Sequence, residues 1–477
     1  MTPQAAFEQL NRIAGIAPLG APIITGSDLQ LPTPLRATTA SAAALGLGGA
    51  IAGEIWRFRG GERQAITIDL RAAAAALMPG SVLRLNGAPL VRRANPTDGF
   101  YQASDRRWIY MQGGPEAKAR RMLVLLNAEN DAASLLEAVA KWNSFALEDA
   151  LAFMQQSGAV VRSADEWRAS LPGRAVLSQP PIILRKIGEA PALRLSDNPM
   201  PLGDVRVLDL THVVAGPAAT RLLASYGADV LSVRAERLAN HDAPDAGAGK
   251  RLAYLDLLKP ADAEALRRLV RGCDIFVDSY RPGALARLGF SPAALAHIAP
   301  GIIHVAVSAY GAEGPWAERR GREEVVQAAT GLTVEQGAFV AARRGSRRES
   351  LPALLPGTVL GTLTGYMAAA GAEAALLRRI REGGSWQVQV SLASTAMWLQ
   401  SLGQIEARAV PAEFDPRTGL DPYLGSCEIG GDVLEFLGPV VKMSKTPPLK
   451  GAPPRRAEAP HWASSHEDAN APQAQPA

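Results

Sequence analysis

The sequence predicts an α/β protein, in which a large domain built on a Rossmann-like parallel sheet carries a smaller α+β domain. Short apolar segments typical of strands recur in the second half of the chain, at 205–210, 229–233, 273–280 and 301–311. Helical segments separate them, and the segment 261–272 places its apolar residues on one face, as an amphipathic helix requires. Apolar strands that alternate with helices are typical of a parallel sheet covered by helices on both faces.

The composition limits the classes of protein to consider. At 477 residues the chain is long enough for two or three domains, and 47% of its residues are apolar, so it can bury a sizeable core. The formal net charge is only +4 and the basic residues are scattered, which predicts no nucleic-acid partner. Cys273 and Cys427 lie far apart in apolar segments, which predicts two buried thiols rather than a disulfide framework or a metal site.

Targeting and metal-binding signals are also lacking in the sequence. The first residues, MTPQAAFEQLNRIAG, do not have the charged-then-apolar order of a signal peptide. No run reaches the roughly 18 apolar residues that a membrane span needs, so we expect a cytoplasmic protein without a membrane partner. The six histidines show no paired ligand spacing, which predicts no catalytic metal.

An internal repeat links the two ends of the chain. Residues 34–77 and 356–399 both read as an Ala/Gly-rich helix, a basic turn with a Gly-Gly pair, an alternating strand and a second Ala-rich helix. The same supersecondary unit is therefore expected twice.

The domain organisation follows from changes in composition. We expect residues 1–80 to form the end of a first large-domain copy, and 81–180 to form the small α+β domain. In this small domain, GFYQASDRRWIYMQGG predicts a hairpin, and LEDALAFMQQSGAVVRSADEWRASLPG predicts two helices joined by a short turn. The remaining segments are a proline-rich extended linker, the large domain, a C-terminal segment and a Pro/Ala-rich disordered tail, at 181–204, 205–400, 401–445 and 446–477.

Two strand exits carry candidate ligand contacts. In DLTHVVAGPAATRLL, the turn Ala215–Gly216–Pro217 leads into a helix, and Pro217 suits a first helical position because its missing N–H needs no partner there. Many strand-to-helix turns look alike, so a purely structural role is the alternative for this turn. In DSYRPGALARLGF, Arg281 follows a strand, where its guanidinium either grips a phosphate or caps the strand end at the surface. Lys250 follows a glycine-rich loop at the same edge of the sheet, so a phosphate-bearing ligand is indicated. No dinucleotide fingerprint and no P-loop motif occurs.

The motifs named so far, together with GPWAERRGREEVVQAATG and GTLTGYMAAAGAEAALLRRIREGGSWQVQVSL, resemble the class III CoA-transferases, the CaiB/BaiF family. The resemblance is continuous over roughly 201–400, and residues 34–200 look like the later part of a second copy. It implies an acyl-CoA and a small carboxylic acid as substrates, no permanently bound cofactor, and a homodimer of interlocked chains.

The resemblance also implies a mechanism and roles for particular residues. A carboxylate attacks the acyl carbon of the thioester, and CoA passes through an enzyme thioester to a second acid. The nucleophile is expected in a step after the GP turn that reads Gly321–Arg322–Glu323 here, so Glu323 takes that role. Arg281 and Lys250 would hold the CoA phosphates, and the Ala215–Pro217 turn would pack against the nucleotide. The alternative is that Glu323 and Glu324 only complement the dipole of a helix N-terminus.

Two departures from the family pattern keep other functions open. Arg322 stands where related racemases have a histidine, and Gly361 replaces an acidic residue often found just before TLTG. Racemase chemistry is therefore disfavoured, and a CoA-transferase is the main prediction. The alternatives are a catalytically degenerate acyl-CoA-binding protein and a CoA-dependent isomerase or lyase on the same scaffold.

Overall fold

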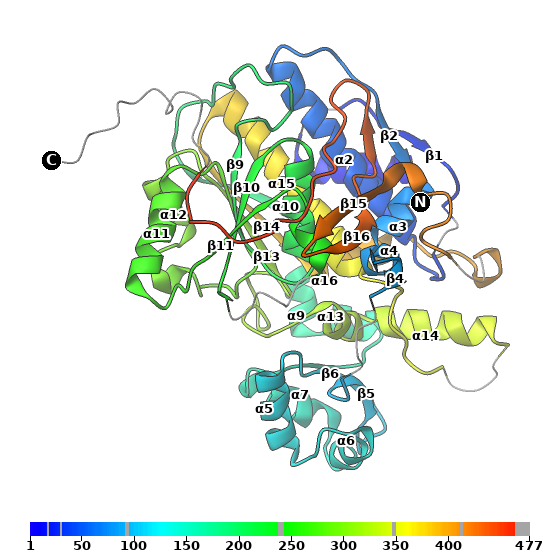
Figure 1. The fold of residues 1–477 in the computed structure, drawn as a ribbon. Helices are drawn as coiled ribbons and strands as arrows, with labels where there is room; N and C mark the ends of the chain where they lie inside the picture. Colours follow the sequence, from blue (N-terminus) through cyan, green and yellow to red (C-terminus); the bar gives the residue numbers. More distant parts are fainter. Residues whose placement is uncertain are drawn as a thin grey trace.

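The computed structural model describes residues 1–16, 19–28, 31–90, 95–236, 243–345, 350–410 and 414–462. Its large domain is built on a seven-stranded sheet with the strand order β11-β10-β9-β12-β13-β14-β8 (Figure 1). The pairs from β11 to β14 are parallel, and β8 is antiparallel to β14. The predicted Rossmann-like parallel sheet is therefore confirmed. The strands are β8 (Ile182–Gly188), β9 (Arg206–Leu210), β10 (Asp229–Arg234), β11 (Arg251–Tyr254), β12 (Ile275–Asp278), β13 (Ile303–Ser308) and β14 (Ser385–Ser391).

Helices cover both faces of this sheet because successive strand residues point to opposite sides. Val207 packs in the cluster that includes residues of α10 and α15, whereas its neighbour Leu208 packs in the cluster that includes residues of α11 and α12. The helices of this domain are α10 (Ala215–Ser225), α11 (Pro260–Arg271), α12 (Pro292–Ile298), α13 (Glu323–Thr330), α14 (Leu332–Arg343), α15 (Val359–Glu382) and α16 (Leu392–Ser401).

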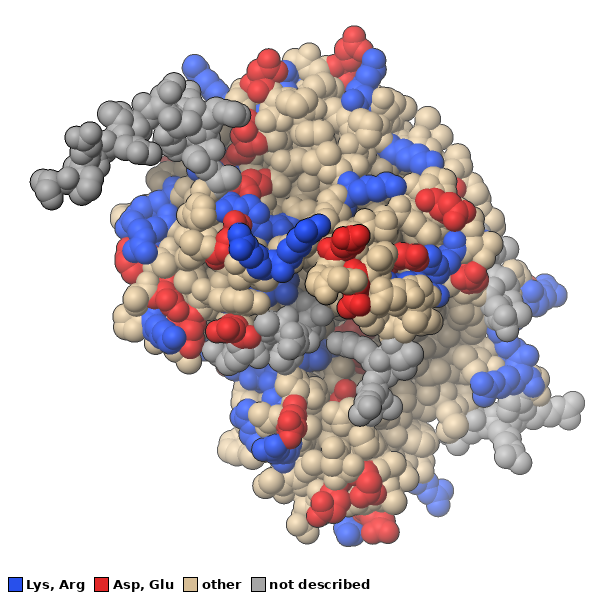
Figure 2. All heavy atoms as spheres, viewed as in Figure 1, with Lys and Arg blue, Asp and Glu red and all other residues tan. Residues whose placement is uncertain are grey.

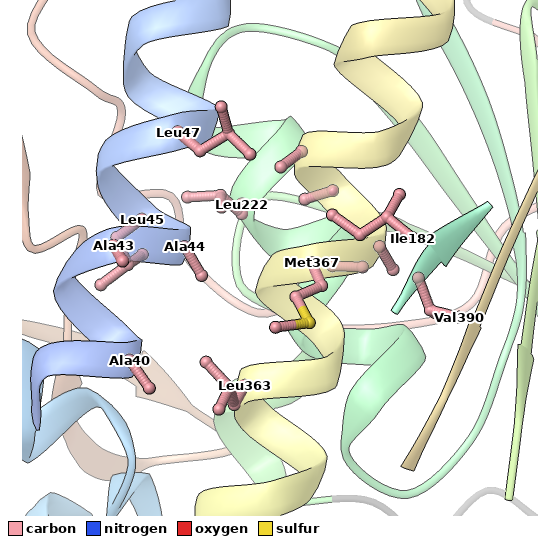
Figure 3. Close-up of a cluster of buried hydrophobic side chains, with 14 of the residues drawn as sticks. Ala40, Ala43, Ala44, Leu45, Leu47, Ile182, Leu222, Leu363, Met367 and Val390 are labelled. Carbon is pink, nitrogen blue, oxygen red and sulfur yellow. The ribbon is translucent and has the colours of Figure 1, made fainter. Parts of the chain in front are cut away.

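The predicted helix–strand–helix unit is present at both places. The first copy is α2 (Ala37–Phe58), β2 (Ile66–Asp69) and α3 (Leu70–Ala76), and the second is α15, β14 and α16. The two long helices pack against each other through small and aliphatic side chains, among them Ala40 and Ala44 of α2 and Leu363 and Met367 of α15 (Figure 3). On another side of α2, Gly49 lies close to β2 and to Val441, since a Cβ added there would lie 2.9 Å from Ile66 Cγ2 and 3.0 Å from Val441 Cγ1.

Each copy also receives a strand that follows the other copy in the chain. Strand β8 lies after the first copy and pairs antiparallel with β14 of the second, at Ile182 opposite Val390. Strand β17 (Val441–Met443) lies after the second copy and pairs antiparallel with β2 of the first, at Val441 opposite Ile68. The two copies are therefore interlocked within a single chain. Strand β1 (Ile23–Thr25) completes the three-stranded sheet of the first copy.

The small domain lies below the large one in Figure 1. Its sheet consists of β5 (Asp98–Gln102), β6 (Trp108–Gln112) and β7 (Ser157–Val160), and its helices are α5 (Glu116–Leu126), α6 (Ala132–Val139) and α7 (Ser144–Phe153). The predicted hairpin is confirmed by the antiparallel pairing of β5 with β6. The predicted short turn after α7 is wrong. This stretch is β7, which pairs with β6 and buries Ala159 and Val160 completely, before the chain continues into α8 (Ala164–Ala169) and α9 (Leu171–Leu177).

The other segments complete the two ends of the molecule. Part of the expected linker, 182–188, is strand β8. The expected disordered tail differs as well, because Leu449 N–H donates to the Ser225 carbonyl and Trp462 Nε1 donates to the Leu269 carbonyl, so residues 446–462 pack along the large domain. Residues 463–477 lie outside the described residues. The α-helices and strands of the described residues not yet named are α1 (Pro3–Ala14), α4 (Pro79–Val82), β3 (Arg84–Leu85), β4 (Ala88–Pro89), β15 (Leu424–Ile429) and β16 (Asp432–Leu437).

Three features predicted from composition can be checked on the described part of the chain. Cys273 is buried, but Cys427 is partly exposed, so only one of the two thiols is enclosed as expected. In the described residues no helix combines the length and apolar character needed to cross a bilayer. The same residues contain no group of three or more His, Cys, Asp or Glu side chains arranged to hold a metal ion.

Candidate active site

The turn between β9 and α10 is held tightly from inside the domain. The side chain of Asp209 accepts hydrogen bonds from the hydroxyl groups of Thr211 (2.5 Å) and Thr220 (2.7 Å). Gly216 packs directly on Thr211, and an added Cβ would lie 2.2 Å from Thr211 Cβ, so the turn requires glycine there. Pro217 is the third residue of α10 rather than the first, and it is tolerated because the N–H groups of the first four helical residues have no partner within the helix.

Lys250 supports this turn from inside the domain. Its ammonium lies 3.1 Å from Asp209 Oδ2 and donates to the Pro217 carbonyl at 3.0 Å, and the side chains of both Lys250 and Asp209 are 0% exposed. Burial would raise the pKa of Asp209, but Lys250 and the two threonine hydroxyls hold it below the usual value. The structure therefore corrects the expectation that Lys250 binds a phosphate, because its charge is already neutralised inside the domain.

Arg281 lies where the sequence predicted, in the loop that follows β12, and its side chain is partly exposed. Its guanidinium donates a hydrogen bond to Gln155 of the small domain. Four further cations surround it, from α5 and from the loop before α13. The cation cluster consists of Lys118, Arg121, Arg281, Arg320 and Arg322.

The cation cluster carries uncompensated positive charge. Burial and the neighbouring Arg320, Arg322, Arg121 and Arg281 lower the pKa of Lys118 to about 8. In the described part of the chain none of the five cations forms an ion pair with a carboxylate. In Figure 2, Lys and Arg side chains gather on the α5 side of the small domain, beside its junction with the large domain. Four of the five cations are partly buried and Arg121 is exposed, and clustered cations without a counter-ion form an anion-binding surface.

Glu323 is the first residue of α13, and its carboxylate is enclosed at the N-terminus of α15. Oε1 accepts hydrogen bonds from the Leu360 N–H (2.8 Å) and from Gln327 Nε2 (3.0 Å), and Oε2 accepts one from the Gly361 N–H (2.7 Å). The residue is 8% exposed. Burial and the nearby charge of Glu324 raise the pKa of Glu323 to about 8, although the three hydrogen bonds oppose that shift.

The carboxylate of Glu323 occupies the space beside Gly361. A Cβ added at position 361 would lie 2.8 Å from Glu323 Oε2 and 3.1 Å from Cγ1 of Val214, which precedes α10. In the family, positions 323 and 361 are both expected to carry acidic residues. Here the carboxylate of Glu323 reaches the space into which a side chain at position 361 would point. A carboxylate delivered from either position would lie next to the β9–α10 turn.

The small domain also contributes to the site, which the sequence did not predict. Gln112 Nε2 donates to Glu324 Oε2 at 2.9 Å, so Glu324 faces β6 rather than α15. A Cβ added at Gly114 would lie 3.5 Å from Arg322 Nη2, so the arginine next to Glu323 lies against the loop that precedes α5. A glycine pair directly after a predicted strand, followed by the basic helix EAKARR, is the signal that could have pointed to this part of the site.

The structure thus groups the predicted residues in two sets. Glu323 lies beside the turn of Ala215, Gly216 and Pro217, and Arg281 lies in the cation cluster, which Arg322 connects to Glu323 along the chain. Lys250 is separate from both because it is buried beneath the turn.

Comparison with known proteins agrees with the motifs. Residues 202–423 match the model of CoA-transferase family III. The resemblance to class III CoA-transferases is therefore confirmed over this part of the chain.

Individual relatives are similar over parts of their length. An acyl-CoA transferase of Gibberella moniliformis is 30% identical over 337 residues, which cover 66% of this chain and 58% of that protein. The acetyl-coenzyme A transferase nodX of Hypoxylon pulicicidum is 29% identical over 324 residues, which cover 63% and 54%. The chain thus spans little more than half the length of these curated relatives. The crystal structure of Rv3272 from Mycobacterium tuberculosis is 32% identical, with coverage of 43% of this chain and 57% of that one and a TM-score of 0.38.

Proposed function

We propose that this chain is a CoA-transferase that moves CoA between an acyl-CoA thioester and a small carboxylic acid, with Glu323 as the nucleophile. The observation that carries the proposal is the position of the Glu323 carboxylate, at the N-terminus of the 24-residue helix α15 and beside the β9–α10 turn. The match of residues 202–423 to CoA-transferase family III supports the same reaction class.

The cation cluster is the proposed site for the phosphate groups of CoA. Guanidinium groups bind phosphate through two parallel hydrogen bonds, and Arg281 and Arg320 offer two such groups close to each other. Lys118 adds a cation from α5, so the small domain would hold the cofactor portion of the substrate against the large domain.

Glu323 would take part in two kinds of acyl exchange, one at the acyl carbon of the substrate and one at its own carboxyl carbon. Oε2 accepts one hydrogen bond from the described residues, so it retains electron density for attack on the acyl carbon of the thioester. The new C–O bond gives a mixed anhydride as the C–S bond breaks and CoA leaves as the thiolate. The thiolate then attacks the Glu323 carbonyl carbon, releases the first acid as its carboxylate and forms an enzyme thioester. The acceptor carboxylate then attacks the enzyme thioester and releases the CoA thiolate, which leaves an anhydride between Glu323 and the acceptor. The thiolate attacks the acceptor's acyl carbon, which forms the new acyl-CoA and restores the Glu323 carboxylate. No proton or electron is gained or lost over the cycle.

The N–H groups of Leu360 and Gly361 would assist the exchange at the Glu323 carboxyl carbon. In that exchange negative charge develops on Oε1 and on the departing Oε2, the two atoms to which these N–H groups donate, and the groups are fixed at a helix N-terminus, where the dipole favours an anion. With a pKa of about 8, the carboxylate is ionised in roughly a tenth of the molecules at neutral pH. The proposed reaction should therefore accelerate towards alkaline pH.

A second candidate is an acyl-CoA-binding protein that does not transfer CoA. The observation that favours it is the enclosure of Glu323, whose raised pKa and three hydrogen bonds are also those of a structural carboxyl group. The cation cluster would serve this function equally well.

A transfer assay separates the two functions. The protein is mixed with short acyl-CoAs and a panel of carboxylic acids, and new acyl-CoAs are measured by chromatography. New thioesters support the transferase, and CoA binding by calorimetry without new thioesters supports the binder. Arg281→Gln should weaken CoA binding, whereas the control Arg120→Gln should not, because Arg120 is exposed and paired with Glu116. An absence of CoA binding would contradict both functions.

A further inference from the structure

Gly361 is a glycine without a backbone reason to be one. It is the third residue of α15 and its φ is not in the left-handed region, so an alanine would suit the helix better by about 1 kcal/mol. Its surroundings give a different reason, since an added Cβ would lie 2.8 Å from Glu323 Oε2. Val214 bounds the same space, at 3.1 Å from the Cβ position, so the carboxylate has no room to move aside on the Val214 side.

The carboxylate cannot be displaced without losing its partners. Oε1 is bound by the Leu360 N–H and by Gln327 Nε2, while Gln327 Oε1 in turn accepts the Leu355 N–H at 2.9 Å. Oε2 is bound by the N–H of Gly361 itself. A methyl group at 361 would push the carboxylate away from the N–H groups that bind it. A buried carboxylate that loses such bonds is strongly destabilised.

We propose that Gly361 is a positioning residue, which leaves the space in which the long side chain of Glu323 presents its carboxylate to the N-terminus of α15. The space holds one carboxyl group, which either position can supply. An aspartate side chain at 361 would enter the same space if the side chain at 323 were shortened. As a statement about catalysis this inference rests on the proposed function, but as a statement about packing it does not.

The packing part is tested by a double-mutant cycle in thermal unfolding, with Gly361→Ala and Glu323→Ala made singly and together. We expect Gly361→Ala to lower the melting temperature in the wild-type background. In the Glu323→Ala background it should have no effect or raise the melting temperature, because the carboxylate is gone and alanine favours the helix. Equal losses in the two backgrounds would overturn the proposal.

The catalytic part is tested by rescue. The double variant Glu323→Ala/Gly361→Asp is compared with Glu323→Ala for CoA transfer and for a covalent CoA adduct located by peptide mass spectrometry. We expect Glu323→Ala to be inactive and the double variant to regain an adduct at position 361. Gly361→Ala alone should lose transfer on the order of a hundredfold with CoA affinity retained, since it misplaces the carboxylate by an ångström or more.

The outcomes distinguish this inference from the proposed function. Transfer by wild type with an unaffected Gly361→Ala variant would overturn the inference and leave the transferase standing. A background-dependent melting temperature with no transfer by wild type would support the packing part and overturn the transferase.

Discussion

Glu323 combines two properties that oppose each other. Its burial and the charge of Glu324 favour the protonated acid, while the N–H groups of Leu360 and Gly361 favour the carboxylate. The result is a pKa of about 8, within the range where a general base or nucleophile responds to small changes of pH.

The transfer rate should therefore follow the ionisation of Glu323. Below a pH of about 8 the rate should fall about tenfold for each pH unit, because only the carboxylate attacks the thioester. In Glu324→Gln this limb of the pH profile should move to lower pH, since the neighbouring negative charge is removed. A steady-state pH profile checks both points, and a limb that does not move in Glu324→Gln would contradict the assignment.

The raised pKa of Glu323 also makes the stability of the folded protein fall as the pH rises. The folded protein keeps a proton on Glu323 at pH values where an ordinary, unfolded glutamate has lost it. This retained proton stabilises the folded protein. Its contribution to the free energy of unfolding is present below the pKa that the glutamate has in the unfolded chain, and it is lost as the pH rises through about 8. In Glu323→Gln the decline of stability over this range should be shallower than in wild type, as urea titrations at several pH values would measure.

Lys250 and Arg281 should respond to substitution in opposite ways. Lys250→Met leaves Asp209 buried without its counter-ion, so the free energy of unfolding should fall by about 3–5 kcal/mol. Arg281→Gln should weaken CoA binding by on the order of tenfold and change stability by less than about 0.5 kcal/mol, as for other surface changes. Urea unfolding and calorimetry measure the two effects, and a stable Lys250→Met protein with weakened CoA binding would contradict the structural role.

At the residue scale the sequence predicted part of the site. Glu323 was assigned from the resemblance to the CoA-transferase family, and the Ala215–Pro217 turn was assigned because ligands bind at strand exits of a parallel sheet. Lys250 was misread because a lysine after a glycine-rich loop looks like a surface cation, and only the fold shows Asp209 beneath it. The position of Lys118 in the cation cluster was missed because it depends on how the small domain packs on the large one.

At the scale of elements, the site depends on the crossing of α15 and α10. A Cβ added at Gly365 would lie 2.4 Å from the Ala215 carbonyl oxygen and 2.8 Å from Ala218 Cβ. Glycine at this position lets the two helices approach, and the approach sets the distance between the N-terminus of α15 and the β9–α10 turn.

Gly365→Ala should therefore loosen this crossing. We expect the free energy of unfolding to fall by about 1–3 kcal/mol, as for other overpacked cores. Gly80→Ala is the control, because nothing lies within 4 Å of the Cβ position there. Urea unfolding compares the two, and equal stability of both variants would contradict the close crossing.

The sequence predicted most elements but not all of their roles. Long periodic segments such as α11 were recognised because one apolar face is sufficient to identify a helix. The short strands β7 and β8 were read as a turn and a linker, because their strand conformation depends on the edges of β6 and β14, which are distant in the chain.

At the scale of the whole molecule, the two repeat copies complete each other. Strand β8 extends the sheet of the second copy, β17 extends that of the first, and α2 packs on α15 between them. The repeat was visible in the sequence, but the exchange of strands was not, because strand pairing across more than 200 residues leaves no local signal. A homodimer stays a prediction, and the pairing of the two copies does not depend on it.

This interlocking predicts the behaviour of fragments. Residues 1–200 and 201–477, produced separately, should each lack a cooperative unfolding transition, because each exposes a face of α2 or α15 that the other buries. Produced together, they should copurify and regain the transition. A cooperatively folded, monomeric 201–477 fragment would contradict this account.

The measurement that tests the central claim most directly is the intact mass of the protein after mixing with short acyl-CoAs. Wild type, Glu323→Gln and the matched control Glu324→Gln are compared, with hydroxylamine added to cleave thioesters. We predict a hydroxylamine-sensitive CoA adduct on wild type and on Glu324→Gln, and none on Glu323→Gln. An adduct that persists in Glu323→Gln, or CoA binding by wild type with no adduct, would contradict the role of Glu323 as the nucleophile.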